Sequence, residues 1–156
     1  MILPILIWLL QDMLQVVFMG IFLVPELFLL ALIFAGLQPD NERGHDFCWY
    51  IIVGFIGGLL WDFRWTNLPG LTAALNAGLI TIVFLIWHVI PIQGRNEKSF
   101  AFCAIGSQFI SAVIHAMLWT VPNMVAVRLF FIQQLMGVTL IILLYFVYKK
   151  AIYRHV

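Results

Sequence analysis

Residues 47–92 read FCWYIIVGFIGGLLWDFRWTNLPGLTAALNAGLITIVFLIWHVIPI and decide the fold. Two long apolar runs, residues 47–60 and 71–92, are separated only by a short polar connection around residues 64–69. Neither run shows the alternation of apolar and polar residues that a barrel strand requires. Because unpaired backbone groups are very costly in hydrocarbon, runs of this kind cross a membrane as helices. The segment therefore predicts a hairpin of two transmembrane helices.

The same apolar character continues on both sides of this hairpin. Residues 100–121 and 129–147 predict two further spans. The first 37 residues would make a single rod of roughly 55 Å, too long for a hydrocarbon layer of about 30 Å. We expect two short spans there, with a break near residues 20–26, where Pro25 suits the first turn of a helix and Glu26 complements its positive end. The count is six spans, with five as the alternative.

Composition supports a single transmembrane domain over residues 1–156. Of the 156 residues, 64% are apolar and 10% are charged, against about half and a quarter in soluble domains. A soluble fold of this size would expose a large apolar patch to water, so a soluble domain is excluded. The net charge of +1 gives no basic field for nucleic acid. The expected fold is an all-α, polytopic transmembrane helical bundle.

The positive charges indicate an orientation. Under six spans, the side that holds both termini carries six Lys and Arg residues and the opposite side carries only Arg64 and Arg128. The positive-inside rule then places both termini in the cytoplasm. We expect a multi-pass protein of the bacterial cytoplasmic (inner) membrane, in contact with membrane lipid.

Small residues mark one face of the third predicted span. Gly54, Gly58 and Asp62 recur every four residues, so a neighbouring helix can approach closely there. The next span repeats the spacing and is expected to supply the matching surface with Gly70, Ala74 and Gly78. Such faces serve either packing within one chain or recognition of a second protein's helix, and the sequence leaves both open.

Asp62 is the most costly of these residues, because a carboxylate near the apolar zone needs a partner or a place at the interface. Arg128 or a loop amide is the expected partner. Asp62 is then either a structural tether or a functional contact. With Arg64 and Arg128, it is a candidate for a partner interface at the outward-facing end.

Two polar stripes lie on other spans. Ser107, Ser111 and His115 follow one another at four-residue steps, with Gln108 beside them. Asp12 belongs to a stripe on the first span and is expected near the middle of the membrane. We predict that these four residues, Asp12 included, form a buried polar stripe, in which His115 is either a hydrogen-bonded packing residue, a donor to Asp12, or part of a proton relay.

Catalytic constellations are not recognisable in the sequence. Asp62 lacks the second motif carboxylate of an intramembrane aspartyl peptidase, and Gly106-Ser107 lies on the same predicted helix as His115, unlike a rhomboid-type serine protease. The two cysteines, Cys48 and Cys103, make neither a disulfide framework nor a metal site. We expect no enzyme activity, no metal and no cofactor.

Residues 54–73, GFIGGLLWDFRWTNLPGLTA, resemble the signature region of the MreD family of rod-shape-determining membrane proteins of bacteria. The family pattern is a glycine-containing span that ends in Gly, two or three apolar residues and Asp, followed by a short loop and Gly-Leu. Gly54, Gly58 and Asp62 match the first half, and Gly70 and Leu71 match the second. Pro25-Glu26-Leu27 is similar to the Pro-Asp-Leu at the start of the family's second span.

The resemblance implies a non-catalytic scaffold of the cell-elongation machinery, which synthesises peptidoglycan in rod-shaped bacteria. Its direct partner would be an MreC-like membrane protein, with MreB, RodA and a penicillin-binding transpeptidase as indirect partners. The family's fold has been likened to the six-span substrate-binding subunits of energy-coupling-factor transporters. A substrate-binding subunit of a vitamin-type transporter is therefore the alternative function, and it predicts convergent polar groups around an outward-facing cavity.

Overall fold

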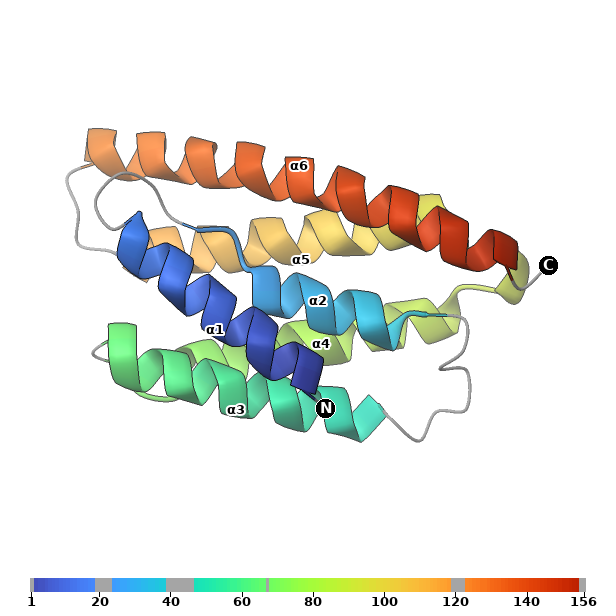
Figure 1. Cartoon of the computed structure of the whole chain (residues 1–156), viewed down its shortest axis with the longest axis horizontal. Helices are drawn as coiled ribbons and strands as arrows, with labels where there is room; N and C mark the ends of the chain where they lie inside the picture. Colours follow the sequence, from blue (N-terminus) through green and yellow to red (C-terminus); the bar gives the residue numbers. More distant parts are fainter. Residues whose placement is uncertain (1, 19–23, 39–46, 67, 119–122, 155–156) are drawn as a thin grey trace.

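The computed structural model describes residues 2–18, 24–38, 47–66, 68–118 and 123–154. In these ranges the chain is helical, with no strand. The elements are α1 (Ile2–Val17), α2 (Leu27–Gly36), α3 (Phe47–Trp65), α4 (Leu71–Val89), the 3-10 helix η2 (Ile92–Gly94), α5 (Glu97–Leu118) and α6 (Asn123–Arg154). Figure 1 shows them as one elongated bundle, and the all-α prediction is confirmed.

Four helices are long and apolar enough to cross a membrane: α3, α4, α5 over Glu97–Met117 and α6 over Val127–Lys150. The first 37 residues form two helices, as expected, but both are shorter. The 10 residues of α2 correspond to a length of about 15 Å, roughly half of the hydrocarbon thickness. Length and composition thus indicate a membrane protein, with four helices in its described part that could span the bilayer.

The short helix α2 is the centre of the bundle. It contacts every other α-helix of the described chain, and Figure 1 shows it enclosed by α1, α4, α5 and α6. Leu29, Leu32 and Ile33 are fully buried, because α2 is apolar all round its axis. The core therefore forms around the helix that is too short to span on its own.

The break before α2 has a different local structure from the one expected. The helix begins at Leu27, so Pro25 lies outside its first turn. Glu26 is at the N-cap position but makes no side-chain hydrogen bond to the first turn. Its carboxylate is directed elsewhere in the bundle, as described below. Pro25 is therefore not in the first turn as predicted, whereas Glu26 lies at the N-terminal end of α2 as predicted.

The four long helices pair as two antiparallel hairpins, α3 with α4 and α5 with α6. We call the end of the bundle formed by the last turn of α3 and the first turn of α4 the turn end; it lies at the left of Figure 1. At the opposite end the Tyr148 hydroxyl donates a 2.8 Å hydrogen bond to the Leu37 carbonyl oxygen. The ring of Tyr148 stacks on Phe100 with 4.5 Å between centroids, which anchors α6 to α2 and α5.

Candidate functional site

The α3–α4 turn is built around the carboxylate of Asp62, whose residue is completely buried (0% exposed). Asp62 Oδ2 accepts hydrogen bonds from the backbone nitrogens of Thr72 at 2.9 Å and Ala73 at 3.3 Å. Its Oδ1 accepts from the Thr66 hydroxyl at 3.1 Å. The first amides of a helix have no partner within the helix and carry its positive end. Asp62 of α3 therefore caps α4.

Gly70 makes the turn before α4 possible. Its φ angle is 92°, in the left-handed region that glycine adopts without steric cost. The turn brings the amides of Thr72 and Ala73 back toward Asp62. Gly70 and Leu71 form the second half of the pattern that resembles the MreD signature. They position the Thr72 and Ala73 amides, which bind Asp62 in the first half of the pattern. Asp62 is satisfied by helix amides, and among the described ion pairs Arg128 is not its partner.

The glycine face of α3 lies against neighbouring helices. A Cβ atom at Gly58 would lie 2.6 Å from the Cα of Ala73, and one at Gly54 would lie 2.4 Å from the side chain of Ile80. The prediction that Gly70, Ala74 and Gly78 form the matching surface on α4 is wrong, however. Gly78 has no heavy atom within 4 Å of its missing Cβ position, and Ala74 is exposed. The residues of α4 that face the glycines of α3 are instead Thr72, Ala73 and Ile80.

Asp12 pairs with the last turn of α3. Its Oδ1 lies 2.8 Å from Trp65 Nε1 and 3.1 Å from Arg64 Nε. The arginine side chain is 54% exposed, whereas the carboxylate is buried. Asp12 therefore lies at the turn end and not in the middle of the bundle, because α1 runs toward the last turn of α3. The hypothesis that His115 is the donor to Asp12 is wrong.

His115 binds Glu26 instead. His115 Nδ1 lies 3.1 Å from Glu26 Oε1, and Gln11 Nε2 donates to Glu26 Oε2 at 3.3 Å. On its other side, His115 Nε2 lies 3.5 Å from the hydroxyl of Thr72. Since the amide of Thr72 binds Asp62, a continuous polar cluster joins α1, α2, α3, α4 and α5. Ser111, one turn before His115, is buried and extends the same face of α5.

Three glutamines satisfy backbone groups before α2 and in its first turn. Gln15 Oε1 accepts from the Val24 nitrogen at 3.1 Å, and Gln133 Nε2 donates to the Val24 carbonyl oxygen at 3.5 Å. Gln11 Oε1 accepts from the Phe28 nitrogen at 2.8 Å. Irregular backbone at membrane depth is tolerated only where protein groups satisfy it. Gln11 and Gln15 belong to the polar stripe of the first predicted span that also contains Asp12, and this stripe was the sequence signal for polar contacts of α1. The sequence did not indicate their backbone partners, which lie 9 to 17 residues away.

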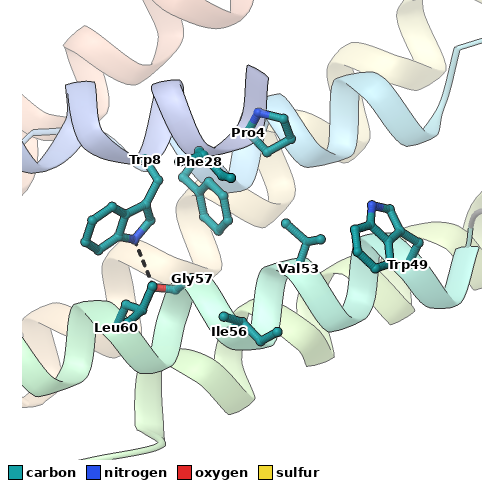
Figure 2. A pocket seen from close by; sticks show the side chains of 9 residues that line it. Pro4, Trp8, Phe28, Trp49, Val53, Ile56, Gly57 and Leu60 are labelled. Atoms are coloured by element: carbon teal, nitrogen blue, oxygen red, sulfur yellow. Dashed lines mark hydrogen bonds between the residues drawn. The ribbon is translucent and has the colours of Figure 1, made fainter. Parts of the chain in front are cut away.

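An apolar groove opens between α1 and α3 (Figure 2). It has a volume of about 240 Å³, with Pro4, Trp8, Trp49, Val53 and Leu60 among its walls and Phe28 of α2 behind them. Trp8 Nε1 donates a 2.9 Å hydrogen bond to the Gly57 carbonyl oxygen and closes one end. The groove offers contact surface for apolar groups.

Metal-ligating residues do not converge in the described ranges: no group of three His, Cys, Asp or Glu side chains could hold an ion there. The charged side chains that do converge are engaged in the contacts given above. Comparison with protein-family models finds no match, and neither a curated protein nor a solved structure matches the chain.

Proposed function

We propose that this protein is a non-catalytic membrane scaffold, and that it serves the bacterial cell-elongation machinery by docking an MreC-like partner. The observation that carries the proposal is the clasp formed by Asp62, Gly58, Gly70, Thr72 and Ala73. The residues that resemble the MreD signature are adjacent in space and fix one hairpin. A hairpin fixed in this way presents a defined surface, which suits recognition.

The candidate interface divides into a hidden and an accessible part. Asp62 is fully buried and cannot contact a partner, so its role is to shape the turn end. Arg128 is exposed and is available to an acidic loop of the partner, whereas Arg64, which is also exposed, is paired with Asp12 and would contact a partner from within that pair. In the proposed orientation, with six spans and both termini in the cytoplasm, the turn end faces outward. MreB, RodA and a penicillin-binding transpeptidase would then be reached through the partner.

Fewer observations support the alternative function, a substrate-binding subunit of a vitamin-type transporter. The side chains that could line the outward-facing cavity required by that function are Asp62, Arg64, Asn67, Asn76 and Arg128. Asp62 instead binds the amides of α4, and Arg64 binds Asp12. Asn67, another expected contributor, lies outside the described residues.

Purification in mild detergent tests the proposal. The tagged chain is isolated from bacterial membranes that contain an MreC-like protein, alongside a Gly58→Leu variant and the matched Gly106→Leu control. We expect the partner to be recovered with the wild type and the control and to be lost with Gly58→Leu at equal expression. Equal recovery with all three would contradict the scaffold role of the clasp, and a stoichiometric vitamin in native mass spectra would favour the transport subunit.

A further inference from the structure

Several buried polar atoms of α4 and α5 have no hydrogen-bond partner among the described residues, and we call them the row. The row consists of Asn76 Oδ1, Ser111 Oγ and both amide atoms of Gln108. The three residues are 3%, 0% and 1% exposed, respectively. Nearly all buried polar groups in native proteins are hydrogen-bonded to protein or ordered water, so a group of orphans needs a physical explanation.

The register of the two helices places these residues next to the polar cluster. Thr72 and His115 are in contact at 3.5 Å and fix the alignment of antiparallel α4 and α5. Asn76 follows Thr72 by four residues, and Ser111 precedes His115 by four. Both residues therefore lie one helical turn deeper, at the same level and on the facing sides.

Gln108 extends the row toward α6. A Cβ atom at Gly137 of α6 would lie 3.1 Å from Gln108 Cγ, so the amide of Gln108 packs against the bare backbone there. The row therefore begins one helical turn from the Glu26–His115 pair, with Asn76 and Ser111. It ends with Gln108 at the α5–α6 contact. Its atoms supply acceptors at Asn76 and Gln108, a donor at the Gln108 amide and a hydroxyl at Ser111, which does both.

We propose that this row binds water within the bundle, and that the water continues the Asp62–Thr72–His115–Glu26 cluster toward the interior. A buried water needs two to four polar partners. Asn76 and Ser111 provide two partners at one level of the bundle, and Gln108 provides a further donor and acceptor about one turn along α5. The register places Asn76 and Ser111 at one level of adjacent helices, and neither polar atom has a hydrogen-bond partner in the described chain, as expected where a water bridges two groups. The ligand class is water, and its chemical consequence is a hydrogen-bonded route for proton exchange with the buried Glu26–His115 pair.

The sign of a stability change tests the proposal and does not depend on the scaffold function. If Ser111 Oγ is dry, Ser111→Ala removes an unsatisfied polar atom and raises the melting temperature. If it holds water, the same change lowers the melting temperature by about 2–4 °C, as expected for the loss of one hydrogen bond in a chain of this size. Ser107→Ala is the matched control, since Ser107 is equally buried on α5 but already donates to the Ala104 carbonyl oxygen at 3.0 Å.

A double-mutant cycle of Asn76→Leu and Ser111→Ala tests whether the two residues share a water. We expect coupled effects, with the double variant losing less than the sum of the single variants, because the water is lost only once. Additive effects, or a higher melting temperature for Ser111→Ala than for the wild type, would overturn the proposal. The purified wild type in nanodiscs is also melted in sodium chloride and in choline chloride. A sodium-specific rise would show that the row binds a cation and would overturn the assignment to water.

Radiolytic hydroxyl labelling gives a readout that does not require variants. Water activated by X-rays modifies side chains beside it even in a protein interior. We expect modification of His115 on α5, normalised to the intrinsic reactivity of each side chain, at a rate above that of Phe100, which is fully buried nearer the start of the same helix. Protection of His115 to the level of a dry core residue would contradict the hydrated row.

Discussion

The Asp62 carboxylate and the backbone nitrogen of Thr72 lie 2.9 Å apart, so a side chain of α3 caps the first turn of α4. A helix is usually capped by a residue just before its own first turn. Here that position is Gly70, which cannot cap because it has no side chain. The close approach at Gly58 lets the carboxylate of the neighbouring helix take over this role. The hairpin and its cap therefore depend on each other.

Replacing Asp62 tests this dependence. Asp62→Leu leaves the Thr72 and Ala73 amides unsatisfied, at a cost of roughly 1–3 kcal/mol for each amide. Asp62→Asn keeps one acceptor oxygen and is expected to lose less. Thermal unfolding in detergent measures both variants against the wild type. If Leu and Asn were equally stable, the carboxylate would contribute nothing to the turn.

Gly58→Ala is expected to separate α3 from α4. The new methyl group would meet the backbone of Ala73, which cannot rotate away as a side chain does. Overpacking of this kind costs about 1–3 kcal/mol. Gly106→Ala is the matched control, because its Cβ would have no heavy atom within 4 Å. Unfolding temperatures that fall equally for both variants would mean that general loss of glycine, and not the contact with Ala73, matters.

Removing Arg64 is expected to cost more than removing the whole pair. Arg64→Ala leaves the buried Asp12 carboxylate with the Trp65 indole as its remaining described partner. We expect a loss of about 1–3 kcal/mol, part of which Asp12→Asn restores in the double variant. Chemical denaturation of the two single variants and the double variant measures this. A double variant less stable than Arg64→Ala would rule out an unpaired charge as the cause.

Trp8→Phe removes the hydrogen bond that ties α1 to α3 beside the groove. The bond from Trp8 Nε1 to the Gly57 carbonyl is 2.9 Å long, and its loss is expected to cost about 0.5–1.5 kcal/mol. Faster hydrogen exchange of the α1 amides is the measurement. Trp49→Phe, which changes the groove wall on α3, is the control and should leave α1 unchanged. Equal exchange of α1 in both variants would assign the effect to groove packing.

The proposed orientation is tested with single cysteines in a background where Cys48 and Cys103 are replaced by serine. Leu68→Cys, in the exposed α3–α4 turn, should react with a membrane-impermeant maleimide in intact spheroplasts. Asn96→Cys, in the exposed connection before α5, should react only after the membrane is opened. The reverse pattern would place the turn end in the cytoplasm and would contradict docking of a partner outside.

The sequence predicted the helical class, the break in the first 37 residues and the close approach at Gly58, because these follow from apolar length and small-residue spacing. Spacing did not predict which residues of α4 face α3. Ala74 and Gly78 share the four-residue repeat, yet the turn at Gly70 rotates α4 so that Ala73 faces Gly58.

The polar pairings were also beyond sequence reasoning. His115 binds Glu26, and Asp12 binds Trp65 and Arg64. Which polar side chains meet depends on where each helix begins and how it is rotated and tilted, and an apolar run records none of these. The role of Gln11 was hidden for the same reason, since its two partners belong to the segment around the start of α2.

The position of α2 has a consequence for how the protein is made. A ten-residue apolar helix is too short to be retained as a spanning segment by the insertion machinery, which responds to stretches of about 20 residues. When α2 leaves the ribosome, the helices that will surround it have not yet been synthesised. Glu26, at its polar start, can bind Gln11 of the preceding helix, but it gains its His115 partner only when α5 has been synthesised. The bundle around α2 should therefore be completed only after the C-terminal half has been synthesised. Chains truncated before α5 should be substrates for quality-control proteases.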